Sequence, residues 1–165
     1  MRFLLYVIVG VTVMTSAARA DGIVSFTVDN INKVFLERAV PLFEKHGLRG
    51  TLYAQTGPVG VEEWDMSWDD IRTMRDKGWE IGAHSYSHMV HLSKADPPML
   101  DLELGAPAAR IFRETGIYPQ TFATPFGDFD ERVLKNIRHY YDAHLMAWGN
   151  DGRNSMTGVD PFRVH

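Results

Sequence analysis

The sequence contains no cysteine among its 165 residues. A chain without thiols has no disulfide bonds, no thiolate metal ligands and no cysteine nucleophile. Any metal ion must therefore be held by nitrogen and oxygen atoms. Basic residues are also fewer than acidic ones. The 17 lysines and arginines and the 21 aspartates and glutamates give a formal net charge of −4. Without a basic cluster, this balance argues against nucleic acid or an anionic membrane as the main partner.

The sequence has one long apolar run, at its N-terminus, and that run is too short for a membrane span. Arg2 precedes apolar residues from Phe3 to Met14, and small residues with an Ala18-Arg19-Ala20 cleavage pattern follow. A transmembrane helix needs about 20 apolar residues. We therefore expect residues 1–20 to be a signal peptide. The mature chain is then exported, to the periplasm or the extracellular space, and has no stable membrane span.

Residues 21–165 are long enough for one domain with its own core. Apolar, partly β-branched segments alternate along this domain with segments of helical apolar spacing. The predicted strands lie at Gly22–Val28, 48–55, 79–84, 120–124 and 142–148, with helices between them. The first strand is expected to be buried. This alternation predicts an α/β fold with a parallel sheet covered by helices, either open or closed into a barrel.

Several residues predict how the helices begin or break. Pro41 lies within the first helical pattern and should kink or divide that helix. Gly105 and Pro107 should break the third helix in its middle. Ser67 and Asp70 resemble a capping box at the start of the second helix, and Asp128 and Glu131 are expected to cap the fourth.

Polar residues follow three of the predicted strands, and in parallel α/β folds chemistry collects at the carboxyl ends of strands. His84 ends the third strand and His88 comes four residues later. On a helical turn, two such histidines can reach one cation, since their β-carbons lie about 5–6 Å apart. A solvated helix face explains the same spacing. Asp29 and Asn30 end the first strand, where they either face a metal and a substrate or terminate the strand and cap the next helix.

Three segments in this order, "VSFTVDN", "EIGAHSYSH" and "TFATPFG", resemble the first three motifs of the polysaccharide deacetylase family. This family is also known as the NodB-homology or chitooligosaccharide deacetylase domain, carbohydrate esterase family 4. The resemblance covers most of residues 21–165. It implies a distorted (β/α) barrel and a metal-dependent hydrolysis of N-acetyl groups from a polysaccharide or oligosaccharide that contains N-acetylglucosamine.

The resemblance also implies roles for individual residues. Asp29 takes the position of the catalytic base, and His84 and His88 take those of two ligands to a divalent metal, with zinc as the expected ion. Asn30 stands where the family has an aspartate as third metal ligand. Pro125 and Phe126 match the third motif, which lines the sugar groove and supplies a backbone N–H to the oxyanion.

The sequence departs from the family pattern in three respects. Asn30 is neutral and should bind a dication more weakly than a carboxylate does. Ala123 replaces an arginine that tunes the catalytic aspartate in many relatives. The sequence stops before the later Leu-His motif, so the barrel is expected to be incomplete at its C-terminus and the general acid is not identified. Two alternatives therefore stay open: a non-catalytic carbohydrate-binding relic of the fold, and an amide hydrolase that needs no metal. The sequence predicts no oligomeric state.

Overall fold

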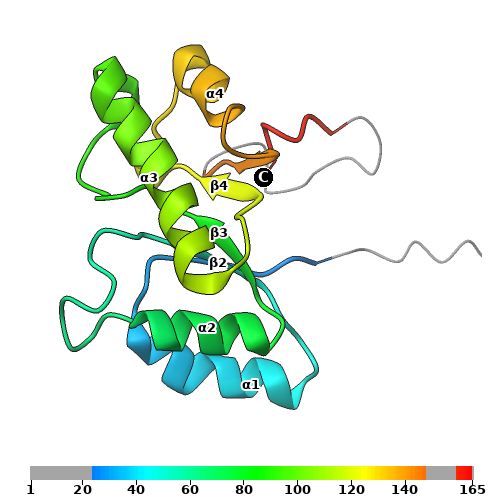
Figure 1. Ribbon diagram of the computed structural model, residues 1–165. Helices are drawn as coiled ribbons and strands as arrows, with labels where there is room; N and C mark the ends of the chain where they lie inside the picture. The colour runs from blue at the N-terminus through cyan, green and yellow to red at the C-terminus, as the bar shows by residue number, and fades with distance from the viewer. Residues whose placement is uncertain (1–23, 148–158, 165) are drawn as a thin grey trace, which may run out of the picture.

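The computed structural model describes residues 24–147 and 159–164 (Figure 1). Its centre is a five-stranded sheet in which every pair of neighbouring strands is parallel. The strands are β1 (Thr27–Asp29), β2 (Thr51–Ala54), β3 (Glu80–Ala83), β4 (Thr121–Ala123) and β5 (Ala143–Leu145). The predicted parallel α/β sheet is therefore confirmed. The predicted signal peptide and the end of the fifth predicted strand, at Trp148, lie outside the described residues.

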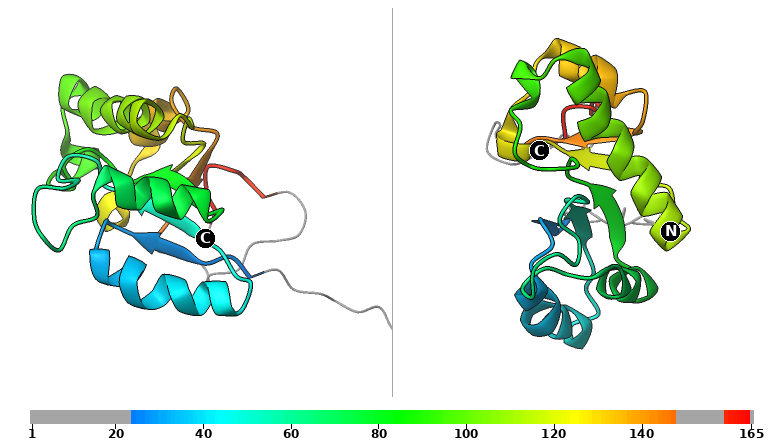
Figure 2. Two further views of the ribbon diagram at one scale, coloured as in Figure 1. Left: turned by 60° about the horizontal axis from the view of Figure 1, so that its bottom comes forward. Right: turned by 60° about the vertical axis from the view of Figure 1, so that its left-hand side comes forward.

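The strand order distinguishes a barrel-type sheet from a doubly wound one. Each strand pairs with the next one along the chain, in the order β1-β2-β3-β4-β5. A doubly wound sheet reverses direction at a switch point, whereas a (β/α) barrel adds its strands in sequence. Figures 1 and 2 show a curled sheet that corresponds to part of such a barrel. The distorted, incomplete (β/α) barrel that the sequence implies is thus the observed fold.

The first strand is more exposed than predicted. Of the three residues in β1, only Val28 is partly buried, and its two neighbours are exposed. The physical reason is position, because β1 lies at the edge of the sheet and pairs only with β2 among the described strands. At the opposite edge, Val164 forms a parallel bridge to Leu145, so that residues 161–164 run along β5.

Four helices follow one another around the sheet: α1 (Val40–Lys45), α2 (Trp68–Asp76), α3 (Pro97–Thr115) and α4 (Glu131–Ile137). In both ribbon figures α1 lies beside α2, and α3 lies between α2 and α4. Short helical turns precede α1 at Phe35–Ala39 (η1), α3 at Leu92–Lys94 (η2) and α4 at Pro125–Gly127 (η3). None of the helices in the described ranges is both long enough and apolar enough to cross a bilayer.

The two prolines inside the helical patterns behave differently. Pro41 follows a π-helical turn that runs directly into α1 with right-handed helical backbone at Ala39 and Val40, so the helix is irregular before the proline but is not divided. Pro107, however, lies inside α3, which continues unbroken, so the predicted break at Gly105 and Pro107 is wrong. Tertiary packing outweighs propensity here, since α3 buries a long face that includes Leu104 and Ile111.

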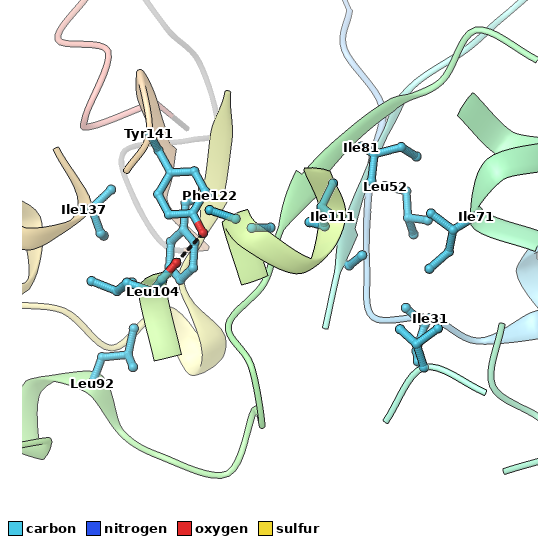
Figure 3. Close-up of a cluster of buried hydrophobic side chains, with 14 of the residues drawn as sticks. Ile31, Leu52, Ile71, Ile81, Leu92, Leu104, Ile111, Phe122, Ile137 and Tyr141 are labelled. Carbon is cyan, nitrogen blue, oxygen red and sulfur yellow. Dashed lines mark hydrogen bonds between the residues drawn. The ribbon is translucent and has the colours of Figure 1, made fainter. Parts of the chain in front are cut away.

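The core lies between the sheet and the helices (Figure 3). Strand side chains meet helix side chains across this layer, and the fully buried members include Leu52, Phe122, Ile71, Leu104, Ile111 and Ile137. The hydroxyl of Tyr141 donates a hydrogen bond of 2.6 Å to the carbonyl of Leu104, which satisfies the one polar atom of that buried ring. Burial of this apolar surface is the main force that holds the strand ends in place.

Both predicted helix caps were tested by the structure, and one is correct. The Ser67 hydroxyl accepts from the Asp70 N–H, and the Asp70 carboxylate accepts from the Ser67 N–H, which forms the predicted capping box of α2. The cap of α4 is Asp130, whose carboxylate accepts from the Val133 N–H at 2.8 Å, and not Asp128 or Glu131. The carboxylate of Asp128 is directed instead to Ser93.

Replacing Ser67 with alanine is expected to lower the free energy of unfolding by about 1 kcal/mol, because an N-terminal N–H of α2 loses its acceptor. Urea unfolding followed by circular dichroism measures this difference. Ser25→Ala is the matched control, since Ser25 is exposed and lies outside the helices. Equal midpoints for the two variants would contradict the assigned cap.

Candidate active site

The register of the sheet brings three of the predicted segments to one edge. Asp29 pairs with Tyr53, Ala54 pairs with Ala83, and Ala83 also pairs with Phe122. The ladder continues one residue further, because the Asn30 N–H donates to Tyr53 and the His84 N–H to Ala54, each at 3.0 Å. The residues that follow β1, β3 and β4 therefore meet at the carboxyl edge of the sheet.

His84 is buried at this edge and its ring has a fixed orientation. Its Nδ1 lies 2.8 Å from the carbonyl oxygen of Ala123, an acceptor, so Nδ1 carries the proton and Nε2 keeps its lone pair. Burial lowers the pKa of His84, and the nearby Asp29 carboxylate opposes this shift. His84 is thus a neutral imidazole with its lone pair on Nε2, and Asp29 lies within electrostatic reach of it.

His88 lies next to His84, but not by the geometry that the spacing suggested. Residues 84–88 form a loop rather than a helical turn. His88 itself has a left-handed backbone, with φ of 57°. This loop brings the two rings together at a centroid distance of 4.8 Å. The interpretation as a solvated helix face is therefore wrong, and the two imidazoles form a pair.

Ring contacts connect the pair of His84 and His88 to the segment after β4. The ring of Phe126 lies 4.6 Å from that of His88 and 4.9 Å from that of His91. Phe126 is 51% exposed, whereas Pro125 before it is buried. His91 also lies 3.8 Å from a carboxylate oxygen of Asp128, which ties the loop after β3 to the loop after β4.

Backbone strain is concentrated at this edge. In the described part of the chain, the non-glycine residues with positive φ are Asn30, Ser85, His88 and Phe126. This conformation costs roughly 1–2 kcal/mol for most L-residues, although asparagine tolerates it better. All four belong to the three segments that meet at the carboxyl edge. Strain of this kind gathers where the surrounding structure must hold particular side chains in place.

The structure rules out a helix-capping role for Asn30. The N–H of Val34 is accepted at 2.9 Å by the side chain of Asn32, so Asn32 and not Asn30 serves the start of that helix. Asn30 lies instead at the strand end beside Asp29, with its side chain exposed. The capping alternative is therefore wrong for this residue.

Sequence reasoning missed two buried polar residues that support the edge. Glu103 on α3 contacts the loop that carries His88. His144 on β5 is hydrogen-bonded through Nε2 to the Thr124 hydroxyl and through Nδ1, at 3.0 Å, to the Phe162 carbonyl. Neither belongs to a motif, and a polar residue within an apolar segment was the only available signal.

Residues 16–141 match the family model described as polysaccharide deacetylase, which is well over half of the chain. The chain belongs to the polysaccharide deacetylase family. A comparison with curated proteins gave no match.

Solved structures of polysaccharide deacetylases share the fold. The deacetylase PplD of Streptococcus pyogenes, solved with acetate, has a TM-score of 0.73 and 19% identity over 78% of this chain and 57% of its own. BC0361, a polysaccharide deacetylase from Bacillus cereus, has a TM-score of 0.73 and 21% identity over 84% of this chain and 44% of its own. A BA3943 mutant, described as a CE4 family pseudoenzyme with restored enzymatic activity, has a TM-score of 0.65 and 21% identity, covering 74% and 43%. The chain thus spans about half the length of these structures.

Polysaccharide deacetylases are generally metal-dependent, and the residues at the edge fit a metal in part. His84 has the protonation and the carbonyl contact that are typical of a metal-bound histidine. His88 offers a second imidazole beside it. Within residues 24–147 and 159–164, however, no three histidine or acidic side chains are placed to hold a metal together.

Proposed function

We propose that this chain removes N-acetyl groups from an N-acetylglucosamine-containing polysaccharide, with zinc as its metal. The observation that carries the proposal is the His84 ring, which the Ala123 carbonyl orients beside His88 and near Asp29. A buried, neutral and oriented imidazole paired with a second one is what a nitrogen-based metal site requires.

His84, His88 and Asn30 would hold the metal. A divalent cation there supplies Lewis acidity, which lowers the pKa of a water molecule and polarises the acetamide carbonyl. Asp29 accepts a proton from the attacking water. The oxygen of that water bonds to the carbonyl carbon, the C–N bond breaks, and both protons of the water, including the one that Asp29 accepted, end on the leaving nitrogen, which gives acetate and a protonated amine. Pro125 and Phe126 border the substrate, and backbone donors near Phe126 stabilise the oxyanion.

We also propose that residues 1–20 direct export, so that residues 21–165 meet their polymer outside the cytoplasm. The chemistry of this substrate agrees with the absence of a basic cluster, because a neutral sugar polymer needs no cationic surface. Mass spectrometry of the exported protein is expected to show an N-terminus at Asp21. An uncleaved Met1 in the exported fraction would contradict the proposed signal peptide.

The direct test of the function is acetate release from N-acetylglucosamine oligomers by the purified mature protein with added zinc. We expect acetate and free amine in equal amounts. Dialysis of the protein against a chelator should abolish this acetate release. If neither the native protein nor the Asn30→Asp variant releases acetate with zinc, a deacetylase function is wrong.

Asn30 favours a second candidate, a non-catalytic carbohydrate-binding protein. A neutral third ligand weakens the site, and the similar BA3943 shows that the family includes at least one pseudoenzyme. This alternative predicts sugar binding that is indifferent to chelators and to Asp29→Asn. A metal-independent amide hydrolase would instead keep its activity in the presence of a chelator.

Replacing Asn30 with aspartate is expected to tighten zinc binding by about 10–100-fold, because a carboxylate replaces an amide next to the cation. Competition with a chromophoric chelator measures the change. Asn32→Asp is the matched control, since Asn32 lies two residues away and its side chain serves the helix start. An equal gain in both variants would indicate general electrostatic attraction rather than direct ligation.

A further inference from the structure

Glu103 is a buried carboxylate. Among residues 24–147 and 159–164, its polar contacts all lead to the histidine loop, defined as residues 84–88. Its side chain comes from α3 and the residue is 1% exposed. One oxygen accepts the N–H groups of Tyr86 at 3.0 Å and Ser87 at 2.9 Å, and the other accepts the Ser87 hydroxyl at 2.6 Å. No ion pair involves Glu103 within the described ranges.

The opposite side of the histidine loop is held as well. The carbonyl of Ser85 accepts from the Thr56 N–H at 3.2 Å, and that of Tyr86 accepts from the Gly57 N–H at 2.7 Å. The Ser87 carbonyl accepts from the Gln55 side chain at 3.1 Å. The residues after β2 thus bind the carbonyl side of the loop, and Glu103 binds its amide side.

A contribution to stability alone does not explain a carboxylate at this position. Burying a charge without a counter-ion costs several kcal/mol unless hydrogen bonds compensate, and an apolar side chain would fill the same space at lower cost. Here the compensating donors are the amides of a loop whose backbone is left-handed at Ser85 and His88. The acceptor and the strained loop therefore stabilise one another.

We propose that Glu103 is a positioning residue for His88. By fixing the amides of Tyr86 and Ser87, it holds the left-handed turn that places the His88 ring beside the His84 ring. This inference rests on the proposed function of the two histidines as metal ligands. In this proposal, Glu103 contacts neither the metal nor the substrate.

The test compares the zinc affinity of three variants. Glu103→Ala removes both acceptors and is expected to weaken zinc binding by about 10-fold or more. Glu103→Gln is expected to stay within about threefold of the native affinity, because its amide oxygen accepts the two N–H groups and its NH₂ donates to the Ser87 hydroxyl. Ile111→Val on the same helix destabilises the core and is expected to leave zinc affinity unchanged.

Several outcomes would overturn the proposal. Native affinity in Glu103→Ala would show that the loop needs no acceptor. An equal loss in Glu103→Gln and Glu103→Ala would show that the negative charge, rather than the geometry, matters. If Glu103→Ala does not fold, Ser87→Ala, which removes one of the three contacts, must weaken zinc binding in the same direction.

Amide hydrogen exchange separates this proposal from the proposed function. If the native protein binds no zinc, the metal-dependent function fails, and the loop is then examined in the metal-free protein. The Tyr86 and Ser87 amides are expected to be protected in the native protein and in Glu103→Gln, and to exchange rapidly in Glu103→Ala. Equal protection in all of them would overturn the role of Glu103 by itself.

Discussion

Exchanging Asp29 for asparagine is expected to slow acetate release by about 10²–10⁴-fold, because the attacking water loses its general base. The carboxylate lies at the end of β1, close enough to His84 to influence its pKa. Asparagine has nearly the same shape but cannot accept the proton. Initial rates on N-acetylglucosamine oligomers, with zinc present in excess, give the ratio.

The expected loss must be separated from misfolding and from loss of metal. Asp29 is exposed, so the midpoint of urea unfolding should be the same for Asp29→Asn as for the native protein. Asp65→Asn is the matched control, because Asp65 forms a backbone bridge with Asn32 just after the same strand end. A native rate in Asp29→Asn, or an equal loss in Asp65→Asn, would remove Asp29 from the proposed chemistry.

Acidification from pH 7 toward pH 4 is expected to destabilise the fold by up to about 3 kcal/mol through His144 alone. Burial lowers the pKa of His144 from 6.5 to about 4. Below pH 6.5 the unfolded chain therefore binds a proton that the folded chain does not bind until about pH 4. The contribution of His144 to the free energy of unfolding is fully present above pH 6.5. It is lost as the pH falls from 6.5 to about 4.

Urea unfolding at pH 7 and at pH 4.5 measures this effect when the native protein and His144→Gln are compared. At pH 7 the variant is less stable than the native protein, since the contacts of residue 144 with Thr124 and Phe162 change. The difference between their free energies of unfolding should become smaller by about 2–3 kcal/mol at pH 4.5. His46→Gln is the control, because it replaces an exposed histidine outside this contact. A constant difference between native protein and His144→Gln would exclude His144 as the group that titrates.

Much of the fold could be predicted because its signals are local. The order of the elements, the parallel sheet and the capping box at Ser67 follow from periodicity and from residue types that satisfy helix ends. The break at Pro107 was predicted wrongly because local propensity does not reveal how much apolar surface α3 buries. The exposure of β1 depends on the strand's place at the sheet edge, which no property of residues 22–28 determines.

The sequence proposed residues for the candidate site but did not predict the geometry that brings the two histidines together. Strand ends and motif order pointed to Asp29, Asn30, His84 and His88. Spacing suggested a helical turn for the histidines, whereas a loop with left-handed residues brings their rings together. Glu103 was not found because it lies on a different element, and its role depends on long-range contacts that a single sequence does not show.

The left-handed backbone at Asn30, with φ of 72°, limits which side chains that position accepts. Asparagine and aspartate both tolerate this conformation, whereas β-branched residues do not. A carboxylate and an amide can therefore replace each other there with little change in the main chain. If residue 30 is the metal ligand proposed above, a single substitution at this position changes the metal affinity over evolutionary time while the rest of the fold stays the same.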